Sequence, residues 1–277
     1  MTRRRKTWGW VIAILLFAFM LFINVPMILT AINSFRPTNS ILLQSVDLLP
    51  SDATFDNYAT ASSKGGYWDF FRNSIVIALV TTAITLVATG FAGYSLSRYR
   101  TKINAGFSSA LMAFQLFPII LAVVPLFVLF SKFNMMSTPM PVTILYIVMS
   151  LPFCTWMFKG FFDSIPRELE EAARIDGCSS FRAMISVVLP LAGPGAAAVA
   201  IFAFLQAYNE YMVASAFLQN PSSYTISVGL RAFMQQYQTD WGPIFATSVL
   251  AALPPLILFL LLQKWMIKGM AAGAVKG

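Results

Sequence analysis

The sequence predicts an all-α integral membrane protein with six transmembrane helices. Hydrophobic residues make up 58% of its 277 residues and charged residues only 11%, whereas soluble domains average about 25% charged residues. Six apolar blocks of about 20 residues recur along the chain, and a helix of this length crosses roughly 30 Å of hydrocarbon. The predicted spans cover residues 10–32, 74–96, 107–130, 142–162, 196–218 and 244–265.

Basic residues are distributed unevenly between the two sides of this topology. With a cytoplasmic N-terminus, 14 of the 19 Lys and Arg residues lie on the inner side, and the outer ones are Arg36, Lys64, Arg72, Lys132 and Arg231. Cytoplasmic loops of membrane proteins carry such an excess. We therefore predict a cytoplasmic N-terminus at 1–9, a six-helix domain at 10–267 and a cytoplasmic tail at 268–277. The net charge of +8 then reports topology, and no nucleic-acid partner is expected.

The first span follows the basic sequence TRRRK, as the apolar region of a secretory signal does. A signal of that kind has an apolar region of about 7–15 residues and a small-residue cleavage site. The block at 10–32 is longer and lacks a convincing A-x-A, so we interpret it as an uncleaved first span. The outer loop at 33–73 is the longest, and its TFDNY sequence and four aspartates favour a small cap of short helices.

Prolines occur within or beside several spans, at Pro26, Pro118, Pro125, Pro152, Pro254 and Pro255. Each proline inside a helix removes one backbone hydrogen bond and clashes with the preceding turn. Membrane helices tolerate this where neighbouring groups or cavity water satisfy the freed carbonyl. Two interpretations stay open, namely ordinary usage in membrane helices and kinked helices that line a pathway.

The cytoplasmic segment at 163–190 is the most polar part of the predicted helical domain. Its sequence PRELEEAARIDGCSSFRAMISVVLP predicts two short helices. Ser164 is a candidate N-cap of the first helix, with Pro166 in its first turn. Gly177 would end that helix in the left-handed conformation. Ser179 or Ser180 would cap a second helix that ends near Pro190.

Small side chains in the middle of this segment indicate a contact with another protein. Ala172 and Ala173 leave a flat helix face that a second surface can approach closely. The alternative is an amphipathic helix that lies on lipid headgroups, which requires large apolar anchors on one face. We favour docking to a protein because the face carries alanines and acids, and acids repel anionic lipid.

The sequence EAARIDGCSSFRAMISVVLP resembles the EAA loop of binding-protein-dependent ABC importer permeases. It has Glu-Ala-Ala, three residues, Gly, nine residues, a β-branched aliphatic residue, one residue and Leu-Pro. Val187 stands where Ile is more usual, and Cys178 where Ala is common. The resemblance extends to carbohydrate importers of the maltose-permease type, on the smaller membrane subunit, through FRNSIVIAL, FQLFP, SYTISVGL and GMAAGAVKG.

This resemblance implies the type I ABC importer permease fold and a transport subunit rather than an enzyme. In the family the EAA loop forms a coupling helix that is seated in a cleft of the cytoplasmic ATPase. The matching positions are Glu171, Ala172, Ala173, Asp176, Gly177, Leu189 and Pro190. The outer loop with Tyr224, Arg231 and Gln235 resembles the loop that contacts the sugar-binding protein.

The resemblance also implies partners and a location. Partners would be a second, larger permease subunit, two ATPase subunits, an extracellular or periplasmic sugar-binding protein and lipid of the bacterial cytoplasmic (inner) membrane. ATP and Mg²⁺ would bind the ATPase subunits and no cofactor this chain, which lacks the phosphate-binding G-x-x-x-x-G-K-[ST] motif. Maltose or maltodextrin is the leading cargo, with trehalose, another oligosaccharide or a glycerol phosphodiester still open.

Polar residues inside the spans are candidates for a translocation path. Gln206, Asn209 and Glu210 follow an i, i+3, i+4 spacing that places them on one helix face. A carboxylate within the membrane usually faces the bundle interior or water. The group is either a polar pathway lining or a hydrogen-bond cluster that holds helices together. Gln115 is a further amide within a span.

Two other function classes fit the sequence less well than a permease subunit does. An ion-coupled secondary transporter of a small polar solute usually has several intramembrane ion sites, whereas Glu210 is the one qualifying carboxylate. A membrane enzyme would need a nucleophile with its base or a metal site. The sequence contains no histidine, and Cys154 and Cys178 are too few and too far apart for a metal cluster.

Overall fold

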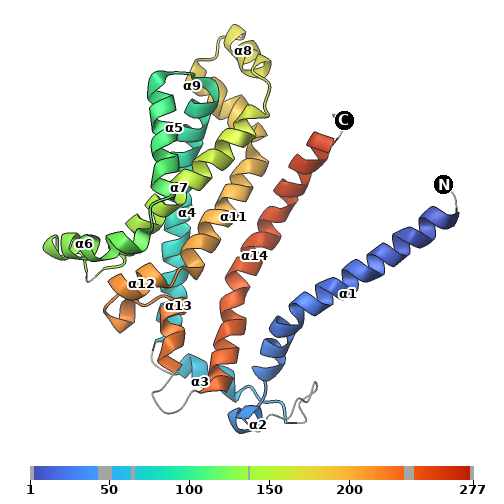
Figure 1. The fold of residues 1–277 in the computed structure, drawn as a ribbon, viewed down its shortest axis with the longest axis vertical. Helices are drawn as coiled ribbons and strands as arrows, with labels where there is room; N and C mark the ends of the chain where they lie inside the picture. Colours follow the sequence, from blue (N-terminus) through green and yellow to red (C-terminus); the bar gives the residue numbers. More distant parts are fainter. Residues whose placement is uncertain (1–2, 43–51, 64–65, 137, 234–239, 275–277) are drawn as a thin grey trace. The chain divides into compact units, whose positions relative to one another are not determined.

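The computed structural model describes residues 3–42, 52–63, 66–136, 138–233 and 240–274, and these contain helices but no β-strand. The chain divides into two compact units. The first comprises Met1–Tyr67 and Leu230–Ala252, and the second comprises Trp68–Gly229 and Leu253–Gly277. Figure 1 shows the helices of both units in sequence colours.

The first unit contains a long apolar helix and a small cap. Its helices are α1 (Arg3–Asn33), α2 (Thr38–Leu42), α3 (Asp56–Ser63), η3 (Leu230–Phe233) and the beginning of α14 (Trp241–Ala274). Asn57 holds the cap together because its side-chain amide donates hydrogen bonds to the backbone carbonyls of Ser34 (2.9 Å) and Arg36 (2.7 Å). The rings of Phe35 and Tyr58 pack 5.2 Å apart. The expectation of a small cap of short helices is confirmed.

The second unit contains the remaining helices. They are α4 (Tyr67–Arg98), α5 (Lys102–Gln115), α6 (Ile119–Lys132), α7 (Met140–Asp163), α8 (Glu168–Ile175), α9 (Ser180–Ala183), the π-helical turn η1 (Met184–Val188), α10 (Leu189–Leu191), α11 (Gly193–Asn209), α12 (Met212–Phe217), η2 (Pro221–Ser223), α13 (Ile226–Gly229) and the rest of α14. Its core lies between α4, α7 and α11 and is built by Tyr94, Cys154, Phe158, Val199 and Ala203.

Four of the six predicted spans are single helices, namely α1, α4, α7 and α14. The third, at 107–130, is a bent pair in which α5 and α6 meet at 96°. Pro118 begins α6 in an extended conformation (φ −69°, ψ 109°). A proline disfavours helical geometry in the residue before it and removes a donor, so a sharp bend at this position is expected.

The fifth predicted span, at 196–218, is not a continuous helix, so this expectation was wrong. The helix α11 ends at Asn209, Glu210 is extended (φ −71°, ψ 127°), and α12 begins at Met212. At its other end, α11 meets the segment Ser180–Leu191 at an angle of 75°. By length and composition the described residues contain four spans, or six if each bent pair crosses once.

Candidate functional site

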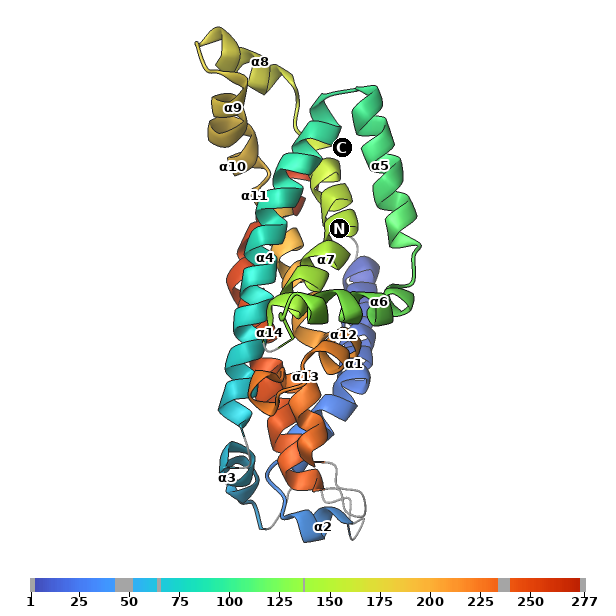
Figure 2. The same cartoon turned by 90° about the vertical axis from the view of Figure 1, so that its left-hand side faces the viewer.

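The helix α8 lies at one end of the second unit, beyond the last turns of α4 and α7 (Figures 1 and 2). It begins at Glu168 after Arg167. The expected N-cap, Ser164, instead ends α7, and its hydroxyl donates to the carbonyl of Phe161 (2.7 Å). The expectation was wrong because Ser164 has helical backbone angles (φ −79°, ψ −12°), whereas an N-cap residue is usually extended.

Gly177 ends α8 as the sequence predicts. Its φ is +90°, which disfavours any residue with a Cβ. The N–H of Gly177 donates to Arg174 (3.1 Å) and that of Cys178 to Ala173 (3.0 Å). This pair of bonds is the Schellman motif, which satisfies the last carbonyls of a helix. The chain then turns into α9, where the Ser179 hydroxyl accepts the N–H of Arg182 (3.3 Å) and so confirms the predicted second cap.

One face of α8 is bound to the C-terminal end of α4. The Nε of Arg98 lies 3.0 Å from Oε2 of Glu170, and their side chains are only 7% and 12% exposed. The hydroxyl of Tyr94 donates to Oε1 of the same carboxylate. Arg98 also donates to the carbonyl of Ile165 (3.1 Å). The Glu170 carboxylate is therefore bound by residues of its own chain.

The opposite face of α8 is open. Glu171, Ala172 and Asp176 are exposed, and Ile175, one turn after Glu171 and Ala172, is 86% exposed. The interpretation of this face as alanines and acids alone was therefore incomplete. We define Glu171, Ala172 and Ile175 as the α8 outer face. A second protein can approach closely at Ala172 and bury the side chain of Ile175. A basic residue of that protein can form an ion pair with Glu171 at the edge of the contact.

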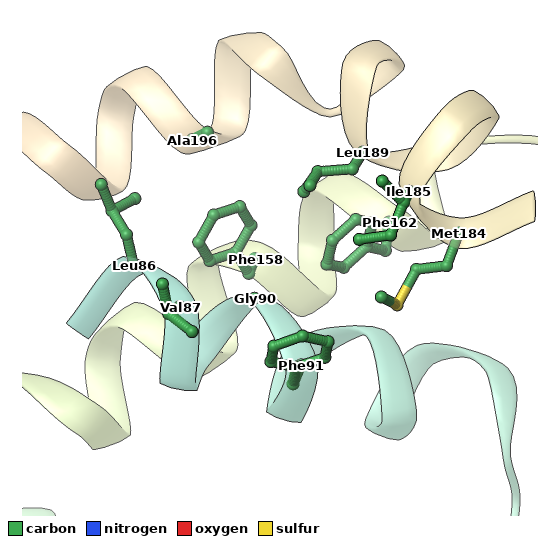
Figure 3. Close-up of a pocket in the computed structure, with 10 residues that line it drawn as sticks. All are labelled: Leu86, Val87, Gly90, Phe91, Phe158, Phe162, Met184, Ile185, Leu189 and Ala196. Atoms are coloured by element: carbon green, nitrogen blue, oxygen red, sulfur yellow. The ribbon is translucent and has the colours of Figure 1, made fainter. Parts of the chain in front are cut away.

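Leu189 and Pro190, the last two residues of the EAA pattern, do not lie on α8. Leu189 contributes to the wall of an apolar cavity of about 400 Å³ between α4, α7, η1 and α11, shown in Figure 3. Phe158 lies between α4 and α11 in this view. The cavity is lined by Leu86, Val87, Gly90, Phe91, Phe158, Phe162, Met184, Ile185, Leu189 and Ala196. The end of the EAA pattern thus packs against the membrane-spanning helices.

The candidate pathway residues are brought together only in part. Glu210 does not continue the helix face of Gln206 and Asn209. Its carboxylate instead accepts the N–H groups of Val213 (3.0 Å) and Ala214 (3.2 Å) at the start of α12 and the hydroxyl of Tyr146 (2.8 Å).

Gln206 and Asn209 have different surroundings. The Oε1 of Gln206 accepts a hydrogen bond from Ser150 of α7 (3.4 Å), whereas Asn209 is exposed. Gln115 is exposed at the end of α5. No hydrogen bond joins it to these groups within the described ranges.

The loop after α12 is fixed to the beginning of α4. The side-chain amide of Asn73 donates to the carbonyls of Ser222 (2.8 Å) and Tyr224 (3.1 Å). The Tyr224 ring is half-buried and lies 6.0 Å from the ring of Phe70. Arg231 is exposed and belongs to the first unit, and Gln235 lies outside the described residues. The role of these three residues stays a prediction.

Sequence reasoning missed the residues that hold the candidate groups in place. Arg98 and Tyr94 bind Glu170 from a helix about 70 positions earlier, and Tyr146 binds Glu210 from α7. A tyrosine within an apolar span and an arginine at its end were the available signals. Neither one identifies its partner, because the contacts depend on how helices pack.

Comparison with known proteins gives the chain a family. Residues 86–272 match the family described as binding-protein-dependent transport system inner membrane component. The chain is 33% identical over 272 residues to the diacetylchitobiose uptake system permease protein of Streptomyces coelicolor, with 98% of both chains covered. It is 36% identical over 256 residues to the maltodextrin transport system permease protein of Bacillus subtilis, covering 91% of this chain and 90% of the relative.

A further relative supports this family, and a solved structure shares the fold. Identity is 34% over 252 residues with the sulfoquinovosyl glycerol transport system permease protein of Agrobacterium fabrum, covering 91% and 88% of the two chains. A chain of a bacterial ABC transporter involved in the import of alginate superposes with a TM-score of 0.78 at 22% identity, over 95% of this chain and 98% of the other. The chain therefore belongs to the inner membrane components of binding-protein-dependent transport systems.

Proposed function

We propose that this chain is a permease subunit of an ATP-driven importer for an oligosaccharide or a related glycoside. It would form the translocation path with a second, larger permease and receive cargo from an extracellular or periplasmic sugar-binding protein. The full-length relatives support the cargo class, since their names specify maltodextrin, diacetylchitobiose and sulfoquinovosyl glycerol, which are all glycosides. Family membership favours this function over ion-coupled transport.

The α8 outer face would dock into an ATPase subunit, and the exposure of its isoleucine is the observation that carries the proposal. Ile175 is 86% exposed on a helix that projects from the cytoplasmic end of the unit. Burying an isoleucine contributes about 1.5–3 kcal/mol, whereas an exposed ion pair contributes about 0–1 kcal/mol. We therefore expect Ile175 to contribute more affinity than Glu171, whose charge would set orientation.

The remaining candidate coupling residues would have roles other than direct docking. They are Asp176, Gly177, Leu189 and Pro190. Gly177 would fix the angle at which α8 leaves the chain, and Leu189 would connect the segment to α4, α7 and α11 through the apolar cavity. ATP and Mg²⁺ would bind the ATPase subunits. Their closure would move α8, and a bias of about 5.5 kcal/mol inverts a 1:99 ratio of two conformations.

Three substitutions test the docking role. Ile175→Ala, Glu171→Lys and Gly177→Pro should reduce co-purification of the ATPase subunits while the permease remains in the membrane. Proline cannot adopt the φ of +90° at position 177. Asp69→Lys makes the same change of charge as Glu171→Lys in the first turn of α4 and serves as the control. Wild-type ATPase yield in all three variants would contradict the docking role.

The cargo class has a separate test. The binding protein that stimulates the purified transporter is titrated with maltotriose, diacetylchitobiose and sulfoquinovosyl glycerol, with an amino-acid mixture as the control. We expect binding of at least one glycoside. Binding of amino acids alone would contradict the carbohydrate assignment without affecting the docking role.

A further inference from the structure

We propose that Tyr94, Arg98 and Glu170 form a tie that makes α8 and the cytoplasmic end of α4 move as one body. We name these three residues the α4–α8 tie. The inference rests on the proposed docking of α8 to an ATPase and identifies the positioning residues through which that motion reaches α4.

The tie satisfies its charged groups within the chain. Both oxygens of Glu170 are engaged, one by Arg98 at 3.0 Å and the other by the Tyr94 hydroxyl. The Arg98 guanidinium also donates to the Ile165 carbonyl (3.1 Å) and the Ser97 hydroxyl (3.2 Å). Because the two charges are almost buried, removing one partner leaves the other uncompensated. The pair therefore differs from a solvent-exposed salt bridge, in which water readily replaces either partner.

Two further contacts join the same segments. Arg167 donates to the Ser97 carbonyl (2.9 Å). The Ser97 hydroxyl donates to Asp163 (2.6 Å), whose second oxygen lies 2.6 Å from Nζ of Lys159. The last turn of α4 is thus bound at residues 163, 167 and 170, which run from the end of α7 into α8.

The chain offers α8 no short covalent route to α4. The helix is linked to α7 through residues 164–167 and to α11 through residues 176–192, whereas Arg98 and Glu170 are 72 positions apart. A displacement of α8 can reach α7 and α11 through the backbone. It reaches α4 through side-chain contacts. The α4–α8 tie contributes the ion pair between Arg98 and Glu170 to these contacts.

Two adjacent acids separate this role from docking. Successive residues of an α-helix point about 100° apart, so Glu170 is paired with Arg98 of α4 while its neighbour Glu171 is exposed. Glu170→Gln and Glu171→Gln make the same chemical change on the same helix. Glu170→Gln should affect the contact between α8 and α4, whereas Glu171→Gln should affect docking to the ATPase.

The tie is tested by a distance between spin labels in the complete transporter in lipid nanodiscs. One label is attached to the native Cys178 and the other to Ile84→Cys on the exposed face of α4, with the buried Cys154 replaced by Ala. We expect one narrow distance distribution that is unchanged by a non-hydrolysable ATP analogue with Mg²⁺. Glu170→Gln should broaden it and make it respond to nucleotide, whereas Glu171→Gln should leave its width unchanged.

Function and rescue complete the test. Glu170→Gln should lower ATP hydrolysis stimulated by the binding protein several-fold while the ATPase subunits co-purify at the parent yield. The exchanged pair Arg98→Glu with Glu170→Arg should restore the narrow distribution. If the exchanged pair fails to accumulate, Glu170→Gln still tests the tie because it keeps the side-chain volume.

Two outcomes would overturn the tie. One is a narrow distribution and normal stimulated hydrolysis in Glu170→Gln, and the other is a nucleotide-dependent distance in the parent protein. Failure of the docking proposal would look different, since Ile175→Ala, Glu171→Lys and Gly177→Pro would then all co-purify with the ATPase at wild-type yield. The distances measured without nucleotide would still report whether the tie holds α8.

Discussion

The Glu210 carboxylate stabilises the break between α11 and α12. It accepts hydrogen bonds from the N–H groups of Val213 and Ala214, which have no intrahelical acceptor because α12 begins at Met212. It also accepts the hydroxyl of the buried Tyr146. This geometry favours the structural interpretation of the polar cluster. A role for Glu210 in the translocation path remains a prediction.

Removing this carboxylate should therefore destabilise the protein. Hydrogen bonds to charged groups contribute about 1.5–3 kcal/mol, so Glu210→Ala should lower the free energy of unfolding by about this amount. Glu210→Gln, which keeps one acceptor oxygen, should lose less. Thermal unfolding in detergent measures both. The exposed neighbour Asn209 is the control, and an equal loss in Asn209→Ala would contradict the capping role.

Of two glycines on α4, one determines how closely this helix approaches α7. A Cβ on Gly93 would lie 2.7 Å from the Cβ of Phe158 and 2.9 Å from the backbone nitrogen of Lys159. A Cβ on Gly90 would meet nothing within 4 Å, because Gly90 lies beside the apolar cavity. The helix–helix contact therefore depends on the absence of a side chain at one position and not at the other.

The same substitution at these two positions should have opposite effects. Gly93→Ala forces backbone atoms apart and should cost about 1–3 kcal/mol, as overpacking does. Gly90→Ala should stabilise the helix by roughly 0.5–1 kcal/mol, because alanine loses less conformational freedom on folding. Unfolding of both variants in the same detergent tests this. Equal stabilities would show that α4 and α7 do not pack at Gly93.

Across the second unit, contacts at the two ends of α4 agree with a chain that crosses the membrane alternately. One end binds α8 through Arg98, and the other binds the segment after α12 through Asn73. The orientation of the whole molecule rests on the excess of basic residues on one side. Both termini on the cytoplasmic side remain a prediction.

A membrane-impermeant maleimide tests this orientation. Cys178 should react in inside-out vesicles but not in intact spheroplasts, since it follows α8 on the side predicted to be cytoplasmic. In a background with Cys178→Ser, Ser222→Cys should show the reverse. The buried Cys154 should react in neither preparation unless the protein is denatured. Labelling of Cys178 in intact spheroplasts would contradict the predicted topology.

The sequence by itself determined the helical membrane class, the positions of four single-helix spans and the end of α8 at Gly177. These features follow from properties that are local in the chain. A run of about 20 apolar residues is long enough to cross a bilayer, and a glycine supplies the left-handed conformation wherever its neighbours are. The resemblance of the EAA segment located the candidate coupling residues for the same reason, since its pattern spans only 20 positions.

The tertiary structure decided which of two adjacent acids is held within the chain, where the fifth span breaks, and which glycine sits at a helix contact. Glu170 faces inward because Arg98 and Tyr94 are there to bind it, and Glu210 ends a helix while Tyr146 donates to it from α7. Each of these outcomes depends on a partner about 60 or more positions away. The sequence around one residue does not identify a partner so far along the chain, because helix packing alone brings the two groups together.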